Sequence, residues 1–334
     1  MDLQGRIQLL VACGNYIQRN DEAWQRAKSK SFSENNWFTG EFIDLATSNI
    51  VKELLQQEVL QQMAMQYHLP KHVEPKKVGV VMPGNIPLAG FYDVLSVFLT
   101  GNIAMIKPSV KDQALIRQLV AYMHQEAPSS AEFLIISEML KGCDAYIATG
   151  SQESGSSFLQ YFSKYPSIIR QKRTSVAVLE GNETREELEK LSGDMHHYFG
   201  LGYQNVKKIY VPEGYDFIPL LDTFNKYDYF TNHNKYKNNY DYHLAMHILN
   251  NKFYMTNSSL LLLEDPGIFA PVGQVHYEFY PSKETLQHLI EQDSILNVVG
   301  HGQFPFGKAQ YPHTDSISKG PDTINFLKSL NGVN

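Results

Sequence analysis

Short runs of β-branched and other apolar residues recur from residue 78 onward, and each is followed by a turn sequence and a helical pattern. The first three runs and the turns that close them are 78–82 with Pro83-Gly84-Asn85, 102–106 with Lys107-Pro108-Ser109, and 145–148 with Thr149-Gly150-Ser151. Strands that alternate with helices indicate βαβ units and a mostly parallel sheet. The order of elements therefore predicts a doubly wound α/β domain.

The rest of the chain predicts a helical beginning and a second, smaller α/β unit. An apolar spacing of three and four over 41–66 predicts one long helix. Thr184 and Glu187 predict a capping box at the start of another helix. Further strands are expected near 175–179, 207–211, 258–263, 273–279 and 295–299. The Tyr- and Asn-rich stretch 223–243 is expected to be solvated rather than part of a core.

Composition excludes several classes of protein. The chain carries 29 Lys and Arg against 35 Asp and Glu, a net charge of -6, whereas proteins that bind nucleic acid carry a basic surface. Its two cysteines, Cys13 and Cys143, have no disulfide or zinc-ligand spacing, so no metal site is expected and a reducing compartment is favoured. No apolar run reaches the roughly 18 residues of a membrane span, and the N-terminus does not read as a signal peptide. We expect a cytoplasmic protein without a membrane span.

The three turns of the first domain form the candidate ligand site. Ligands of open parallel sheets bind beyond the carboxyl ends of the strands, where these turns converge. Lys107 can reach a ribose or a phosphate, and backbone N–H groups after Gly150 can meet an anion at a helix N-terminus. Each turn taken alone is more often an ordinary turn or a helix cap than a ligand site. The chain has neither the GxGxxG fingerprint nor the GxxxxGK[ST] loop.

Taken in order, the segments PGNIP (83–87), GNIAMIKPS (101–109) and TGSQESG (149–155) resemble the aldehyde dehydrogenase superfamily. Three later segments resemble the acyl-CoA reductase family that includes the fatty-acyl reductase of bacterial luminescence: VLEGNETREELEKL, HHYFGLGYQNVKKIYVPEGYDF and FPFGKAQYPHTDSISKGPDTINFL. The resemblance covers about 70 to 330, and the first seventy residues add nothing to it. It implies an aldehyde dehydrogenase-like α/β fold, with a doubly wound cofactor domain and a smaller α/β catalytic domain.

The resemblance also implies an activity and its residues. The activity is NAD(P)H-dependent reduction of an acyl-CoA, or another acyl thioester, to an aldehyde such as a fatty aldehyde, through a thioester on a cysteine. Asn85 matches the asparagine whose amide holds the developing oxyanion. The other matched residues contact the cofactor: Pro83 in the first turn, Lys107 and Ser109 on the ribose side, Gly150 and Ser151 near the phosphates, and Phe269 beside the nicotinamide ribose.

The chain departs from the family at the nucleophile. The family's cysteine lies in a segment that matches 200–206 here, and Tyr203 occupies its position. A phenol with a reference pKa near 10 does not replace a thiolate. Three readings stay open: an acyl-CoA reductase that works by direct hydride transfer or through another nucleophile, a catalytically inactive relative that binds nucleotide or acyl-CoA or acts as a scaffold, and a nucleophile that aligns elsewhere.

Two further departures concern the cofactor. Val110 and Lys111 follow Ser109 where NAD-preferring members carry an acid, which favours NADP(H) over NAD(H). Gly267 stands where the family has a ribose-binding glutamate, which predicts weaker cofactor binding.

A homodimer is an expectation from the family alone. The resulting division is an N-terminal helical segment over 1–70, a nicotinamide-cofactor domain over 71–198, a catalytic domain over 199–315, and a tail over 316–334 that packs on the core or on a partner subunit.

Overall fold

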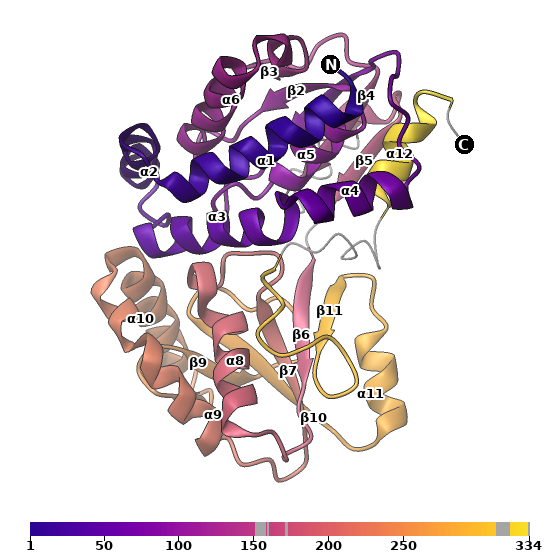
Figure 1. Cartoon of the computed structure of the whole chain (residues 1–334). Coiled ribbons are helices and arrows are strands. Elements are labelled where there is room, and N and C mark those ends of the chain that lie inside the picture. The colour runs from indigo at the N-terminus through magenta and orange to yellow at the C-terminus, as the bar shows by residue number, and fades with distance from the viewer. Residues whose placement is uncertain (151–157, 159, 171–172, 312–320, 333–334) are drawn as a thin grey trace. The chain divides into compact units, whose positions relative to one another are not determined.

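Two β-sheets, each in its own unit of the chain, organise the structure (Figure 1). The computed structural model describes residues 1–150, 158, 160–170, 173–311 and 321–332. Unit 1 comprises Met1–Lys172 and Tyr311–Asn334, and unit 2 comprises Arg173–Gln310. Across the described ranges, none of the helices has the length and apolarity needed to cross a bilayer.

Sheet A, in unit 1, has five parallel strands in the order β3-β2-β1-β4-β5. Their bounds are β1 Lys77–Val81, β2 Ile103–Lys107, β3 Leu134–Ile136, β4 Ala145–Thr149 and β5 Ser167–Arg170. The order confirms the predicted doubly wound arrangement, because the chain leaves β1 toward β2 and β3 and then returns to its other side with β4 and β5. Sequence patterns did not reveal β3 and β5, which are only three and four residues long.

The helices of unit 1 are α1 Leu3–Arg19, α2 Glu22–Glu34, α3 Gly40–Leu54, α4 Gln57–Gln66, α5 Phe91–Leu99, α6 Ala114–Glu126, η1 Pro128–Glu132 and α12 Thr323–Ser329. Buried residues of α1, α3, α5, α6 and α12 form one apolar core with one face of sheet A. On the other face Tyr146 stacks on Phe162, with ring centroids 4.2 Å apart. Sheet A is therefore covered on both faces, as buried parallel sheets require.

The long helix expected over 41–66 is two helices. The side-chain amide of Gln56 donates a hydrogen bond to the carbonyl of Val51, 2.8 Å away, at the end of α3. Gln56 is also the residue from which α4 starts. The apolar period continues across this junction because both helices bury residues in the same core, and the break was therefore not visible in the pattern.

Sheet B, in unit 2, has six strands in the order β11-β6-β7-β10-β9-β8, and β8 alone pairs antiparallel. Their bounds are β6 Thr174–Val178, β7 Val206–Pro212, β8 Met255–Thr256, β9 Leu261–Glu264, β10 Gln274–Tyr280 and β11 Ile295–Val299. The helices are α8 Arg185–His196, η2 His197–Gly200, α9 Ile218–Thr223, η3 Phe224–Asn232, α10 Asn234–Leu249 and α11 Lys283–Ile290. Thr184 and Glu187 form the predicted capping box of α8. The domain boundary expected near 198 lies inside unit 2. Strand β6 precedes residue 198 and pairs with β7 and β11, which follow it, so the three strands belong to one sheet.

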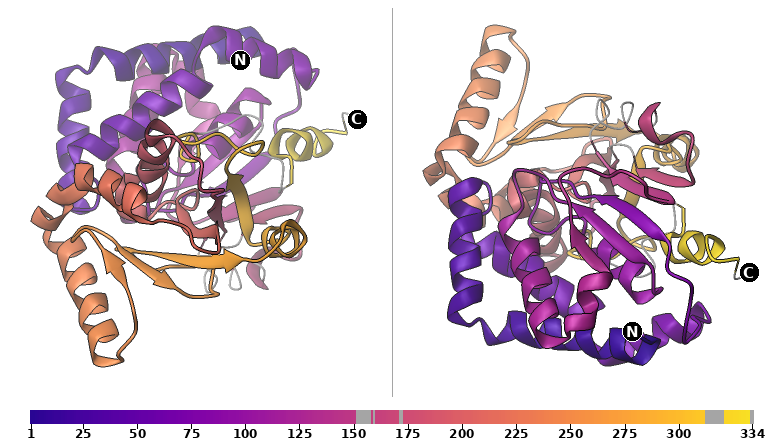
Figure 2. Two further views of the ribbon diagram at one scale, coloured as in Figure 1. Left: turned by 90° about the horizontal axis from the view of Figure 1, so that it is seen from below. Right: turned by 90° about the horizontal axis from the view of Figure 1, so that it is seen from above.

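The expectation of a solvated stretch at 223–243 was wrong. Phe224, Tyr227 and Phe230 are buried and lie three residues apart, which is one turn of the 3₁₀-helix that they form. His196 of α8 stacks on Tyr227, with ring centroids 4.2 Å apart and an angle of 5° between the rings. The polar residues between the aromatic ones form the outer side of the helix. In both views of Figure 2, α10 extends outward from sheet B.

Candidate functional site

The carboxyl edge of sheet A brings the predicted cofactor turns together. Val81, the last residue of β1, pairs with Lys107 of β2 on one side and with Ala148 of β4 on the other. The turns after these three strands therefore start at the same edge, as the sequence predicts. Between β1 and β4 the strand order reverses, and this is where doubly wound sheets bind nucleotides.

The first two turns touch. A Cβ atom at Gly84 would lie only 2.4 Å from Ser109 Oγ, so this approach needs glycine. The Met82 N–H donates to the Lys107 carbonyl over 3.0 Å, which ties the two turns at their base. Pro83, Asn85 and Ser109 are half-buried in this contact, whereas Lys107 is exposed. Two turns far apart in sequence thus form one surface.

Asp112 is a structural member of this edge that sequence patterns did not single out. Its Oδ2 accepts the N–H of Leu88 over 2.7 Å, and Leu88 has a φ of 55°, which L-residues seldom adopt. Asp112 is 1% exposed, and burial raises the pKa of its carboxyl to about 7. The bond fixes the chain after Asn85 to the chain after Ser109.

The third turn is held by Arg170 at the end of β5. The Gly150 N–H donates to the Arg170 carbonyl over 3.3 Å. The Arg170 guanidinium donates to both oxygens of Asp93 on α5, over 3.0 and 2.9 Å, and to Thr323 Oγ1 of α12 over 2.6 Å. Arg170 therefore links the Gly150 turn to α5 and to the last helix. Ser151 lies outside the described residues.

In unit 2, Tyr203 lies in a turn directly before β7. The Gly202 N–H donates to Asn205 Oδ1 over 2.7 Å. The Asn205 amide donates in turn to the carbonyls of Asp194 and His197, over 2.9 and 3.0 Å. Asn205 is fully buried, so these bonds are shielded from water. The turn is fixed by Asn205 and the main chain rather than by the Tyr203 side chain.

The chain before this turn is strained. Tyr198, Phe199 and Gly200 have successive φ values of 56°, 56° and 71°. Two consecutive non-glycine residues in the left-handed region persist only where the surroundings hold them.

Burial raises the pKa of the Tyr203 phenol, which therefore stays protonated at neutral pH.

Lys207 joins the Tyr203 turn to the segment that carries Phe269. Its ammonium donates to the Pro271 carbonyl over 3.4 Å, and it lies 2.6 Å from where a Cβ atom of Gly200 would be. β7 and β10 are parallel neighbours, so the chains leading into them meet at the amino edge of sheet B. Phe269 is half-buried against the cluster formed by Val176, Tyr210, Ile268, Ile290 and Ile295. Lys207 thus ties the Tyr203 turn to the end of the segment that carries Phe269.

Neither cysteine is placed for nucleophilic chemistry. Cys13 is fully buried in α1, and burial raises the pKa of its thiol to about 12. Cys143 precedes β4, at the amino edge of sheet A and hence away from the Gly150 turn. Burial also raises the pKa of Cys143. Both thiols stay protonated at neutral pH, and a thiolate is the reactive form.

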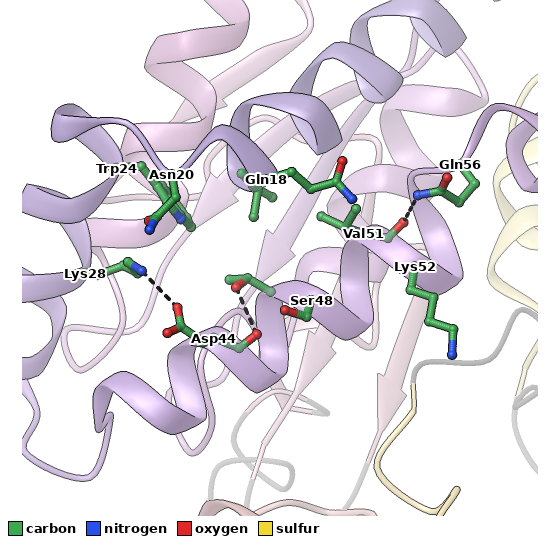
Figure 3. Close-up of a pocket in the computed structure, with 11 residues that line it drawn as sticks. Gln18, Asn20, Trp24, Lys28, Asp44, Ser48, Val51, Lys52 and Gln56 are labelled. Carbon is green, nitrogen blue, oxygen red and sulfur yellow. Dashed lines mark hydrogen bonds and ion pairs between the residues drawn. The ribbon is translucent and has the colours of Figure 1, made fainter.

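A hollow in unit 1 lies between α1, α2 and α3 (Figure 3). Lys28 and Asp44 face each other across it over 2.9 Å. None of the predicted cofactor residues lines this hollow. In the parts of the chain that the structure describes, no three histidine, cysteine or acidic side chains gather as metal ligands.

Comparison with known proteins identifies one family model that matches part of the chain, and a fold. The family model described as acyl-CoA reductase (LuxC) matches residues 15–170. The match includes helices α2 to α4, so the expectation that the first seventy residues add nothing was wrong. No curated protein sequence matches the chain significantly.

Several solved structures similar to this chain are described as aldehyde dehydrogenases. A Burkholderia cenocepacia protein classed as an aldehyde dehydrogenase has 13% identity and a TM-score of 0.66, over 93% of this chain and 76% of its own. Aldehyde dehydrogenase 21 from Physcomitrella patens has 12% identity and a TM-score of 0.65, over 87% and 71%. Indole-3-acetaldehyde dehydrogenase AldA of P. syringae has 11% identity and a TM-score of 0.65, over 86% and 70%. These likenesses confirm the predicted aldehyde dehydrogenase-like α/β fold.

Proposed function

We propose that the chain belongs to the acyl-CoA reductase (LuxC) family, whose model matches residues 15–170, and that it uses NADPH to reduce an acyl thioester to an aldehyde. The observation that carries this proposal is the meeting of the 83–85, 107–109 and 149–150 turns where the strand order of sheet A reverses. We assign the cofactor role to unit 1 and the catalytic role to unit 2. The two free thiols suit the reducing cytoplasm, and a homodimer stays a prediction from the family.

The residues of this edge fit a dinucleotide. Gly84 keeps a side chain out of the contact with Ser109, which leaves main chain at the surface where a ribose or phosphate approaches. The exposed Lys107 supplies a cation, and Pro83 shapes the first turn. Gly150, with Ser151 after it, provides the phosphate end. The bound nicotinamide would supply the hydride.

The chain's own contribution to the chemistry is orientation and charge stabilisation. The Asn85 amide would donate to the acyl oxygen as it gains negative charge, a role that a fixed neutral donor fulfils. Because Tyr203 is a neutral phenol and forms no acyl-enzyme, the hydride would pass directly to the carbonyl carbon of the bound thioester. The carbon–sulfur bond then breaks, and the coenzyme A thiolate leaves and takes up a proton. Acyl-CoA, NADPH and a proton are thus converted to aldehyde, coenzyme A and NADP⁺.

A second function is supported by Tyr203 itself. With a phenol at the nucleophile position and both cysteines buried, the chain lacks the thiolate that the family's chemistry uses. An inactive relative would keep the turns of sheet A and bind dinucleotide or acyl-CoA, or act as a scaffold for an active homologue.

Aldehyde formation separates the two functions. We expect purified protein to produce aldehyde from short-, medium- or long-chain acyl-CoA with NADPH, measured as a trapped hydrazone. Binding of NADPH without any aldehyde from the whole panel would support the inactive relative. Binding of neither NADPH nor NADH would contradict the reductase and leave acyl-CoA binding or a scaffold role for the inactive relative.

NADPH is expected to bind about tenfold more tightly than NADH, a difference of about 1.4 kcal/mol. Val110 and Lys111 are exposed after Ser109, and the next acid, Asp112, is buried and bonded to Leu88. No carboxylate of this stretch is then placed to repel a 2′-phosphate, and Lys111 can attract it. The check is titration of each coenzyme by nicotinamide fluorescence, with Lys111→Glu expected to abolish the preference. Tighter binding of NADH would refute this prediction.

Gly84→Ala is expected to weaken NADPH binding by about tenfold or more, or roughly 1.4 kcal/mol. The new methyl group would meet Ser109 Oγ at 2.4 Å and force the two turns apart. Gly40→Ala is the matched control, because a Cβ atom there meets nothing within 4 Å. Equal affinities of the two variants, measured by the same titration, would show that the contact does not shape the cofactor site.

A further inference from the structure

Helix α10 is apolar on two opposite sides, and the described parts of the chain cover only the inner one. On that inner side Tyr236 is 1% exposed. Tyr240 packs on Leu261 and Leu263 of β9, and Leu244, one helical turn further along, packs against the same cluster. These contacts attach the inner side of α10 to sheet B.

The outer side of α10 carries apolar side chains that lie open to solvent. Tyr242, Met246 and Leu249 recur at spacings of four and three, so they form a stripe along the helix. Ile248 lies at the margin of this stripe, and Phe253 follows the end of the helix. These five side chains, which we call the α10 patch, are each between 39% and 77% exposed. A helix that is apolar on all sides is normally buried on all sides.

The α10 patch is large enough for a protein contact. Its five side chains expose on the order of 600 Å² of surface, more than singly scattered apolar residues account for. Two copies that cover each other's patch would bury about 1,200 Å² in total, which reaches the range of specific interfaces. In both views of Figure 2, α10 extends outward from sheet B, so its outer side projects from the sheet that holds its inner side.

The charges around the α10 patch favour a second copy of this chain as its partner. No charged residue occurs over 242–251. Asp241, which pairs with Lys237 over 2.6 Å, lies directly before this stretch, and Lys252 lies directly after it. An antiparallel copy presents these charges in the reverse order, so that Lys252 of each copy lies near the level of Asp241 in the other. A parallel copy would instead place like charges side by side.

We propose that two copies of this chain associate through the α10 patch in a two-fold, antiparallel arrangement. The two-fold axis passes between the levels of Met246 and Leu249, so each Met246 faces Leu249 of the other copy. The pair covers the side of α10 that sheet B leaves open. The inference does not depend on the proposed reduction, because it uses no cofactor, no substrate and no turn of sheet A.

The test uses two charge variants of the full chain, alone and mixed. Met246→Lys and Leu249→Glu each place a charge at the centre of the contact, opposite an apolar side chain of the other copy. In an equal mixture of the two variants, the new ammonium of one chain faces the new carboxylate of the other, and the second contact of the pair is unchanged. Ile218→Glu is the matched control, because Ile218 is 65% exposed on α9 of the same unit and lies outside the patch.

The measurement is sedimentation velocity over protein concentrations of about 1 to 100 μM, since association depends on the concentration of the protomer. We expect wild type and Ile218→Glu to form dimers. Each charge variant alone is expected to have a dissociation constant at least about a hundredfold higher, and the mixture to recover to within about tenfold of wild type. Far-UV circular dichroism is expected to be the same for all, because every substituted side chain lies at the surface.

Three results would overturn the proposal. Wild type that stays a monomer over the whole range would show that the α10 patch does not join two copies. Charge variants that dimerise as tightly as wild type would place the contact elsewhere on the chain. Charge variants that are monomers and do not associate when mixed would refute the antiparallel arrangement. Binding of NADPH and formation of aldehyde are measured separately, so a failure of the proposed function leaves this test unaffected.

Discussion

Tyr203→Cys is expected to raise the rate of aldehyde formation from acyl-CoA by about a hundredfold or more, which corresponds to roughly 3 kcal/mol of activation free energy. A thiol has a reference pKa near 8.5 against about 10 for a phenol, and its thiolate attacks thioesters to give another thioester. The turn around position 203 depends on Asn205 and on main-chain groups, so a smaller side chain leaves it in place. The measurement is aldehyde production with NADPH, together with the mass of an acyl group on the peptide that contains residue 203.

Two variants control for this gain. Tyr203→Phe removes the hydroxyl without adding a thiol, and it is expected to match the wild type if the phenol has no chemical role. Gln204→Cys places a thiol one residue away in the same turn and is expected to stay without acyl transfer. If wild type and Tyr203→Cys are both silent across the acyl-CoA panel, the catalytic interpretation of this turn loses its support.

Asp112→Asn is expected to stabilise the protein more at pH 8 than at pH 5. The folded carboxyl has a pKa raised to about 7 by burial, against 3.8 for the unfolded chain. Between these values the folded state holds the proton more tightly, so the free energy of unfolding falls as pH rises through the window. The full penalty above pH 7 is at most about 4 kcal/mol, from roughly 3 pKa units. Asp112→Asn regains part of this free energy of unfolding, because the amide carries no charge and its oxygen can still accept the Leu88 N–H.

The measurement is urea unfolding at both pH values. Asp194 is the matched comparison, because burial also raises the pKa of its carboxyl to about 7. Its two oxygens accept the N–H groups of Gly307 and Ala309, over 2.7 and 3.1 Å. An amide has one acceptor oxygen, so Asp194→Asn loses one of these two hydrogen bonds. We therefore expect it to gain less stability at pH 8 than Asp112→Asn. A variant Asp112→Asn that is destabilised equally at pH 5 and pH 8 would show that the carboxyl is not the source of the pH dependence.

Local patterns predicted the strands and turns that carry the cofactor edge. The β-branched runs before Pro83, Lys107 and Thr149 end in turn residues whose preference is set within a few positions, and the structure places strands there. The short strands β3 and β5 have too few residues to show a period. The stretch after Thr223 was misjudged because its buried aromatic residues follow a period of three among polar neighbours.

The groups that hold the candidate site were beyond the reach of sequence patterns. Asp112 bonds to a residue 24 positions away, and Lys207 bonds to Pro271, 64 positions away. Arg170 bonds to Thr323 across 153 positions. Such partners are chosen by the fold and leave no local spacing. The family resemblance pointed to Pro83, Asn85, Lys107, Ser109, Gly150, Ser151, Tyr203 and Phe269, whose roles stay predictions.

The bond between Arg170 and Thr323 has a consequence for how the protein is made. Helix α12 buries Ile324 and Leu327 in the core of unit 1, yet it follows the whole of unit 2 in the chain. Unit 2, by contrast, is encoded without interruption from Arg173 to Gln310. During translation unit 2 is therefore complete before α12 is made, and until then the apolar surface that α12 covers in unit 1 stays open. Loss of α12 would leave that surface open and Arg170 without its partner Thr323.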